Sequence, residues 1–146
     1  MNPLLQEIYA TNCATASDGR KLSIAGQSID QNEAEFLSEI VAELRPVVTL
    51  EVGLAFGASA LAICDALQVT SSNRHIVIDP FQNHRKWSGI GLHNLRRAGF
   101  EQIIEFHEAY SYTILPQLQT TGQKIDFAFI DGAHTFDFVF VDFFLH

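Results

Sequence analysis

The sequence has few cysteines and few basic residues. Its 146 residues include two cysteines, Cys13 and Cys64, with no Cys-x-x-Cys pair, so neither a disulfide framework nor a cysteine-rich metal centre is indicated. Two isolated thiols are typical of a reduced intracellular chain, and we expect a cytoplasmic protein. Nine Lys and Arg stand against 17 Asp and Glu, a formal net charge of −8. This balance argues against a nucleic-acid partner, because basic side chains are needed to neutralise phosphates.

Membrane-spanning runs and an N-terminal basic segment are lacking as well. The first residues carry no signal-peptide pattern. The most apolar stretch, near the C-terminal end, is interrupted by Asp137 and Asp142, so we expect no membrane partner. What is present is an ordinary globular composition of 47% apolar and 18% charged residues, which is enough to bury a hydrophobic core.

Short apolar stretches alternate with amphipathic ones from residue 47 onward. Strands are predicted at 47–52, 75–78, 103–107 and 126–130, with helices at 58–67, 90–98 and 112–118. Such alternation predicts βαβ units and a buried parallel sheet. A helix ending at Leu44 precedes them, with Asp30 and Glu33 as its capping box. The predicted fold class is therefore α/β, a doubly wound sheet in residues 30–146, preceded by a helix and a loop in residues 1–29.

A glycine-containing loop follows the first predicted strand. Gly53 and Gly57 lie in the run Glu51-Val52-Gly53-Leu54-Ala55-Phe56-Gly57-Ala58-Ser59. Glycines let the backbone turn tightly and approach a ligand without Cβ collisions. The free N–H groups at the start of the next helix would point toward that ligand. A plain strand-to-helix turn would need the same glycines, so this loop alone does not decide between the two interpretations.

Asp79 makes a nucleoside ligand the favoured interpretation. It follows the second predicted strand, where a carboxylate can accept hydrogen bonds from the hydroxyls of a ribose; the alternative is a simple Asp-Pro turn. Leu54, Ala55 and Phe56 occupy the place of the middle glycine that a dinucleotide requires, which leaves an NAD-dependent oxidoreductase as the weaker alternative. The loop suits a smaller tail without phosphates, such as the amino-acid end of S-adenosylmethionine.

With these residues the sequence resembles the class I S-adenosylmethionine-dependent methyltransferases, in particular the small-molecule O-methyltransferases related to catechol O-methyltransferase. The resemblance runs from about residue 30 to residue 146 and implies a Rossmann-like sheet in the strand order 3-2-1-4. It implies that Glu51 holds the cofactor's ammonium, directly or through water, and that Asp79 binds the ribose. The cofactor-binding residues that it implies are Glu51, Gly53, Leu54, Ala55, Phe56, Gly57, Ser59, Asp79, Ser111 and Asp131.

The fourth predicted strand ends in the motif Ile130-Asp131-Gly132-Ala133-His134. The resemblance implies that Asp131 gives Mg²⁺ its first carboxylate and that His134 stands where related enzymes carry a lysine general base. We predict that both residues face a small-molecule acceptor and serve methyl transfer to its hydroxyl oxygen. The alternatives are purely structural roles, namely a turn at Asp131 and a polar residue beside a helix cap at His134.

Other polar residues have weaker assignments. The loop at residues 79–89 is predicted to form a lid or an acceptor contact, with Gln82 and Trp87 as its participants, or else a solvated loop with one packed indole. His75, His93 and His107 are interpreted as surface or packing residues.

The C-terminal end bears on activity. Seven of the twelve phenylalanines lie between Phe127 and Phe144, and residues 135–145 are predicted as a helix. The resemblance implies seven strands where four are found, so we expect a sheet truncated after its fourth strand and the following helix. A noncatalytic cofactor-binding fragment is the alternative to an active enzyme. The fourth strand would be a sheet edge, and we expect a homo-oligomer formed through that strand or the last helix.

Overall fold

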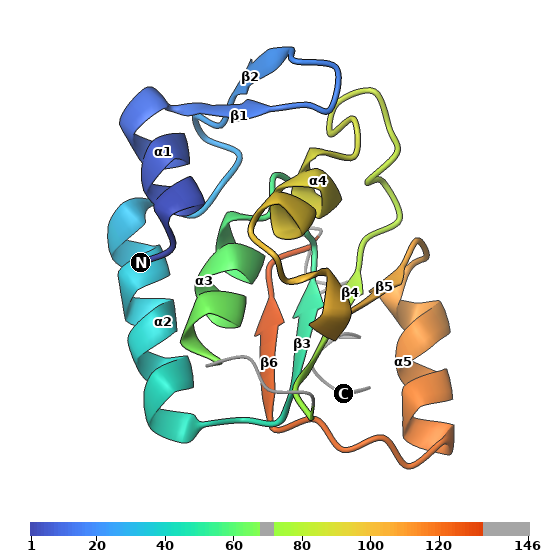
Figure 1. Ribbon diagram of the computed structural model, residues 1–146. Helices are drawn as coiled ribbons and strands as arrows, with labels where there is room; N and C mark the ends of the chain where they lie inside the picture. Colours follow the sequence, from blue (N-terminus) through green and yellow to red (C-terminus); the bar gives the residue numbers. More distant parts are fainter. Residues whose placement is uncertain (68–71, 133–146) are drawn as a thin grey trace.

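A four-stranded parallel sheet forms the centre of the computed structural model, which describes residues 1–67 and 72–132 (Figure 1). The strands are β3 (Val48–Val52), β4 (Arg74–Ile78), β5 (Ile104–His107) and β6 (Phe127–Ile130). They are arranged in the order β5-β4-β3-β6, and each neighbouring pair is parallel. Numbered along the chain this is the order 3-2-1-4, so the predicted fold class is confirmed.

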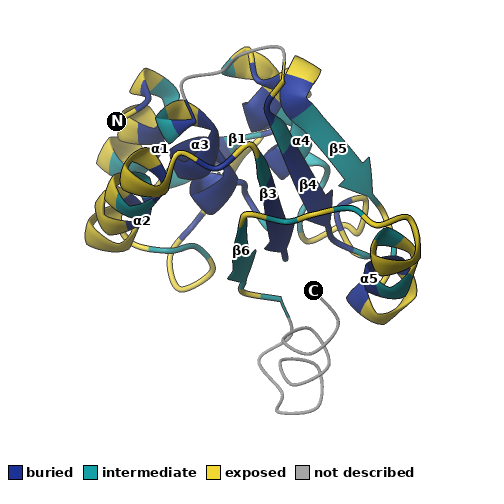
Figure 2. Ribbon diagram, turned by 90° about the horizontal axis from the view of Figure 1, so that it is seen from below, coloured by how far each residue is buried: buried dark blue, intermediate teal, exposed yellow. Residues whose placement is uncertain are grey.

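Helices cover both faces of this sheet (Figures 1 and 2). One face carries α1 (Pro3–Thr11), α2 (Gln31–Leu44), α3 (Ala58–Ala66) and α4 (Ile90–Arg97), and the other carries α5 (Ser111–Thr120). The larger core lies under the first group, and a smaller core joins Leu50, Ile76 and Ile78 to Ile114 and Leu115 of α5. Alternate residues of β3 and β4 therefore face different helices, as expected for buried parallel strands.

The predicted local signals account for most helix boundaries. Asp30 Oδ1 accepts a hydrogen bond from Glu33 N at 2.8 Å, and Glu33 Oε2 accepts one from Asp30 N at 2.8 Å, so the capping box of α2 is confirmed. The helix ends at the left-handed residue Arg45, just before Pro46. The helix α5 runs continuously from Ser111 to Thr120 with Pro116 inside it, and it contains the helix predicted at 112–118. A 3-10 turn, η1 (Glu101–Ile103), leads into β5.

The N-terminal segment contains a hairpin that the sequence prediction missed. In place of the expected loop, β1 (Cys13–Thr15) pairs antiparallel with β2 (Lys21–Ser23). Asp18 and Gly19 form the turn between the two strands, where Asp18 Oδ1 accepts from Arg20 N at 3.0 Å and Gly19 has φ +85°. Strands of three residues are too short to leave a periodic pattern. Ala14, Ala16 and Ile24 nevertheless join the larger core, where β1 contacts α1 and α4.

The C-terminal predictions fall largely outside the described residues. The helix predicted at 135–145 and the base predicted at His134 both lie there. Within the described chain β6 pairs with β3 alone, and its Phe127 and Phe129 are half-buried. Self-association through this edge stays a prediction. None of the helices in the described ranges combines the length and the apolar character that a membrane crossing needs.

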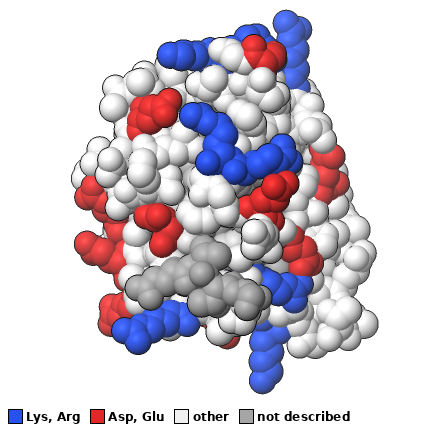
Figure 3. All heavy atoms as spheres, viewed as in Figure 1, with Lys and Arg blue, Asp and Glu red and all other residues white. Residues whose placement is uncertain are grey.

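Charges of both signs share the surface seen in Figure 3, where Lys and Arg side chains gather over α4 with acidic side chains beside them. Arg96 and Arg97, in the last turn of α4, form ion pairs with Glu101 at 3.1 Å and Glu7 at 3.6 Å. The most conspicuous basic group on this face is therefore partly neutralised by neighbouring acids. Exposed pairs of this kind contribute little to stability.

Asp126 ties the start of β6 to the start of β3. Its Oδ2 accepts from Val48 N and Val47 N at 2.9 Å each, and these two bonds hold the pKa of the carboxyl below its usual range. We expect Asp126→Ala to lower the free energy of unfolding by about 1 kcal/mol in urea titrations near neutral pH.

The sign of the pH dependence follows from the lowered pKa. The stabilisation is complete above the unfolded-state pKa of about 3.9 and is lost as the pH falls through the lower folded-state pKa. The gap between parent and variant should therefore close at acid pH. Glu39→Ala on the exposed side of α2 is the control and should leave stability unchanged; a gap that persisted in acid would contradict the assignment.

Candidate functional site

The loop between β3 and α3 is held in an uncommon backbone conformation. Gly53, Ala55 and Gly57 have φ of +92°, +44° and +81°, a region that residues with a Cβ seldom adopt. A Cβ on Gly53 would lie 2.5 Å from the carbonyl oxygen of Asp131, and one on Gly57 would lie 3.1 Å from that of Gly91. Both glycines are thus required by the close approach of other backbone segments, independently of any ligand.

Asp79 fixes this loop from the end of β4. Its Oδ2 accepts hydrogen bonds from Leu54 N at 2.9 Å and Ala55 N at 3.2 Å, while its Oδ1 accepts from Phe81 N at 2.7 Å. The side chain is buried, with 5% of its surface exposed. A carboxylate that accepts several backbone N–H groups holds them firmly. Asp79 is therefore more than the turn residue of an Asp-Pro pair.

Gln82 joins the loop between β3 and α3 to the start of α4. It is fully buried, donates from Nε2 to Ala55 O at 3.1 Å, and accepts at Oε1 from Gly91 N at 2.9 Å. It lines neither of the cavities described below. Its predicted role as a lid or acceptor contact is therefore wrong, because both ends of its amide are used to join the loop to α4.

A chain of buried polar side chains lies between the sheet and α3. Glu51 Oε2 is 2.9 Å from His75 Nε2, and His75 Nδ1 is 2.8 Å from Thr49 Oγ1. Glu51 Oε1 accepts a hydrogen bond from Ser59 Oγ. Thr49, Glu51 and His75 are fully buried and Ser59 is nearly so. His75 is therefore a member of a polar network, which the interpretation as a surface or packing residue did not foresee.

The same network explains the chemistry of Cys64 on α3. Burial raises the pKa of its thiol, and the nearby charges of Glu51 and then Asp65 raise it further. Cys64 is consequently a neutral packing residue in the larger core.

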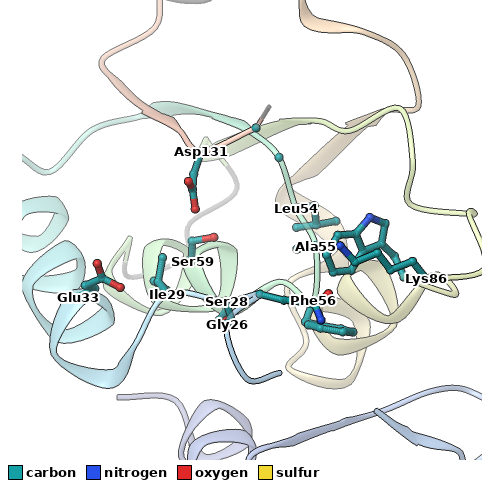
Figure 4. Close-up of a pocket in the computed structure, with 15 residues that line it drawn as sticks. Gly26, Ser28, Ile29, Glu33, Leu54, Ala55, Phe56, Ser59, Lys86 and Asp131 are labelled. Carbon is teal, nitrogen blue, oxygen red and sulfur yellow. The ribbon is translucent and has the colours of Figure 1, made fainter. Parts of the chain in front are cut away.

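Two cavities open at the carboxyl ends of the strands and meet. We call the one beside α2 and α3 the polar cavity, about 460 Å³, and the one beside α5 the apolar cavity, about 350 Å³. Volumes of this size are common for small-molecule sites. The polar cavity, drawn in Figure 4, is lined by Gly26–Ile29, Ser59, Lys86 and other residues, and the apolar cavity by Asp79, Phe81, Tyr110, Ser111 and others. Both are lined by Gly53, Ala55, Trp87, Asp131 and Gly132.

Asp131 lies at the junction of the two cavities. Its backbone N donates to Val52 O at 2.9 Å, which places the residue directly beyond the end of β6. In Figure 4 its carboxylate points into the polar cavity on the same side as Ser59. Among residues 1–67 and 72–132 no three His, Cys, Asp or Glu side chains come together as metal ligands. The Mg²⁺ predicted at Asp131 therefore stays a prediction.

Aromatic side chains separate and border the cavities. Trp87 lines both, packs edge-on against the buried Phe56 at 5.1 Å between ring centroids, and lies 4.3 Å from Lys86 Nζ. Phe81 and Tyr110 contact each other at the rim of the apolar cavity, with centroids 5.8 Å apart. Leu54 is buried beneath the loop. Trp87 thus has the position predicted for a site residue, although its partner in that prediction, Gln82, does not.

The predicted cofactor residues are largely brought together by the fold. Gly53, Leu54, Ala55, Phe56 and Ser59 line the polar cavity, while Asp79 and Ser111 line the apolar one. Gly57 is the N-cap residue of α3 and lines neither cavity. Glu51 lines neither cavity, and both of its carboxylate oxygens are bonded to protein groups. Any effect of Glu51 on a ligand therefore passes through Ser59.

Comparison with known families gives a match at this point. The family described as "Methyltransferase domain" matches residues 50–146, about two thirds of the chain. The chain belongs to this methyltransferase family. The matched range begins inside β3 and contains the glycine loop, Asp79, Ser111 and Asp131.

Individual relatives agree with the family match. The chain is 32% identical over 112 residues to a caffeoyl-CoA O-methyltransferase of Populus kitakamiensis, covering 75% of this chain and 46% of that protein. It is 29% identical over 123 residues to the Stellaria longipes protein of the same name, covering 82% and 48%. The methyltransferase-family chain thus spans about half the length of the curated relatives that it matches.

Solved structures share the fold. An O-methyltransferase from Bacillus cereus in complex with SAH superposes with a TM-score of 0.66 at 21% identity, covering 90% of this chain and 55% of that one. The O-methyltransferase TomG from Streptomyces achromogenes, in complex with SAM, superposes with a TM-score of 0.70 at 19% identity, covering 99% and 61%. At these identities the likeness establishes the fold alone.

Two features were not predicted from the sequence: the cavity-lining segment at residues 26–29 and the buried network of His75. Gly26–Ile29 line the polar cavity and are held near α2 by Tyr9, whose hydroxyl donates to Ile29 O and Asp30 O at 3.1 Å. No sequence signal marks this segment, because its place depends on a contact with α1. For His75 there was a signal: Thr49 and Glu51 alternate on one face of an otherwise apolar strand, and buried polar side chains need partners.

Proposed function

We propose that this chain binds S-adenosylmethionine across the two joined cavities and that the site serves methyl transfer to a hydroxyl oxygen of a small acceptor. The observation that carries the proposal is the meeting of the cavities at Gly53 and Asp131, with the buried Asp79 in one and Ser59 in the other. A ligand with a nucleoside at one end and a charged amino acid at the other fits this division. The family match supports the same choice.

The apolar cavity suits the adenosine half. Phe81 and Tyr110 offer ring surfaces to a purine, and Ser111 offers a hydroxyl. Asp79 Oδ1 accepts a single hydrogen bond from the described residues, that of Phe81 N. A carboxylate oxygen has two acceptor positions, so Oδ1 retains one for a ribose hydroxyl. The predicted roles of Asp79 and Ser111 are consistent with this arrangement.

The polar cavity suits the methionine half. Ala58 and Ser59 line it at the start of α3, and no side chain caps the N–H groups of this helix end within the described residues. Exposed N–H groups at a helix N-terminus favour a carboxylate. The methionine carboxylate would therefore lie over α3, with the ammonium beside Ser59.

The junction of the cavities suits the chemistry. When bound, S-adenosylmethionine supplies a methyl group carried by a positively charged sulfur. The chain must hold an acceptor oxygen in line with that methyl, exclude water and take a proton. The hydroxyl proton of the acceptor would pass to a base of this chain. Asp131 is the described carboxylate at this point, and His134 stays a predicted second base.

The Mg²⁺ predicted at Asp131 stays a prediction, and Asp131 is the one carboxylate of the described residues that lines both cavities. A homo-oligomer formed through β6 and a cytoplasmic location also stay predictions.

Calorimetric titration with S-adenosylhomocysteine tests the proposal. We expect saturable binding of one ligand per chain, because both cavities are formed by described residues alone. Titration with NADH is the discriminating control, and we expect no binding, since Leu54–Phe56 replace the glycine that a pyrophosphate requires. Absence of S-adenosylhomocysteine binding, or preferential binding of NADH, would overturn the assignment. Binding without methyl transfer to any acceptor would favour the noncatalytic alternative.

A further inference from the structure

We infer that His75 is a positioning residue for the methionine end of the cofactor, because it acts through Glu51 to fix the hydroxyl of Ser59 at the floor of the polar cavity. The inference rests on the proposed function, since it assigns the methionine end of S-adenosylmethionine to that cavity. His75 itself lines neither the polar cavity nor the apolar cavity.

The register of the sheet places the network. Thr49 of β3 lies opposite His75 of β4, and Glu51 is two residues further along the same face of β3. Leu50, which lies between Thr49 and Glu51, and its register partner Ile76 on β4 face α5 instead. The polar side chains therefore project toward α3, where Ser59 is in the first turn. The chain of contacts runs Thr49, His75, Glu51, Ser59 and ends at the cavity wall.

Two hydrogen bonds of the imidazole ring define what His75 does. Nδ1 shares a hydrogen bond with Thr49 Oγ1 at 2.8 Å, and the tautomer of the ring decides which of the two atoms donates. On the other side of the ring, a hydrogen bond of 2.9 Å joins Nε2 to Glu51 Oε2. Glu51 Oε2 is therefore bonded to His75, and Oε1 is left for Ser59.

This arrangement gives Ser59 a defined polarity. Its single hydroxyl proton is donated to Glu51 Oε1, so the oxygen lone pairs are turned away from Glu51. Ser59 lines the polar cavity and can therefore only accept a hydrogen bond there. An ammonium group donates and never accepts. The network thus prepares Ser59 for the ammonium of the methionine end, whereas the carboxylate is left to the N–H groups of α3.

The effect should be confined to one end of the ligand. Within residues 1–67 and 72–132, the side-chain hydrogen bonds of Thr49, His75 and Glu51 lead to Arg74 and Ser59, and none leads to Asp79 or Ser111 in the apolar cavity. A residue that merely stabilised the sheet would affect both cavities alike. Selective loss of affinity at the methionine end is therefore the signature of positioning.

The test compares two ligands, three single variants and one double variant. S-adenosylhomocysteine has the amino-acid end, and 5′-methylthioadenosine lacks it. We expect His75→Leu to weaken S-adenosylhomocysteine binding about tenfold, because the orientation of one charge-assisted hydrogen bond is lost, and to change 5′-methylthioadenosine binding less than about twofold. His75→Gln places an N–H near Nε2 and should restore most of the affinity. Ser59→Ala should show the same selective loss, and His75→Leu added to it should cost nothing further.

Each outcome decides something. Equal weakening of both ligands, or additive losses in the double variant, would overturn the inference and leave the proposed function standing. A parent chain that binds neither ligand would reject the proposed function, and with it the inference. If His75→Leu fails to fold because Glu51 is left unpaired, Thr49→Val takes its place: it removes only the Nδ1 partner, and a selective loss of several-fold is expected. No selectivity in Thr49→Val would then count against His75.

Discussion

Replacing Asp79 by alanine is expected to weaken S-adenosylhomocysteine binding by more than about a hundredfold, because charge-assisted hydrogen bonds to a ligand and the shape of the loop are lost together. The Asp79 carboxylate is buried at the floor of the apolar cavity and accepts from the backbone of Leu54 and Ala55. Without this carboxylate the two N–H groups lose their acceptor, and the hydrogen bond that holds Ala55 at its unfavourable φ of +44° is lost. Both halves of the proposed cofactor contact this loop.

Calorimetric titration of the variant measures the effect, and two further variants interpret it. Asp79→Asn keeps one oxygen and should bind with intermediate affinity. Asp18→Ala removes another aspartate that accepts from a backbone N–H, but in the exposed turn between β1 and β2, and should bind like the parent. Undiminished binding by Asp79→Ala would sink the assignment of the ribose site. Circular dichroism of each variant separates loss of the site from loss of the fold.

The fold was predictable because its signals are local or repetitive. Strands rich in β-branched residues alternate with amphipathic helices, and Gly53 and Asp79 directly follow the first two strands of the sheet. This pattern indicates a parallel sheet from the sequence alone. The resemblance to a known family supplied the strand order, which the structure confirms. The hairpin of β1 and β2 was missed because its strands are three residues each and depend on tertiary contacts of β1 with α1 and α4.

The site was predictable in its residue types and less so in their tasks. Gly53 and Gly57 were identified correctly as necessary glycines, but the backbone groups that require them belong to Asp131 and Gly91, far along the chain. Gln82 was predicted to take part in a lid or an acceptor contact, because no sequence signal indicates that its amide would be bonded to Ala55 and Gly91. Long-range contacts of this kind exist only once the sheet is assembled.

The role of His75 could not be predicted from its neighbours in the sequence, because its partners lie on another strand. A histidine in a predicted strand most simply packs against its neighbours, and its own sequence surroundings are apolar. Its partners Thr49 and Glu51 lie on another strand, and only the parallel register of β3 and β4 brings them to one face. Polar residues that alternate on a buried strand are the sequence signal that such a partner exists.

Gly53→Ala is expected to be the most damaging single methyl group that can be added to the loop. The new Cβ would lie 2.5 Å from Asp131 O and 2.8 Å from Gly132 Cα, and both are backbone atoms that cannot rotate away. The clash adds to the strain of a φ of +92°. We expect the free energy of unfolding to fall by more than about 3 kcal/mol, a large part of the stability of a domain of this size.

A matched control separates the clash from the strain. Gly19 has a similar φ of +85°, and no atom lies within 4 Å of its added Cβ. Gly19→Ala should therefore cost only about 1 kcal/mol in urea titrations, the strain of a left-handed residue. If Gly53→Ala is folded at all, the end of β6 must have moved, and Asp131 with it, so that the two cavities no longer meet. Such a variant should lose S-adenosylhomocysteine binding together with stability. Equal costs at the two glycines would mean that the loop is not pressed against β6, and the junction on which the proposed site depends would have no fixed geometry.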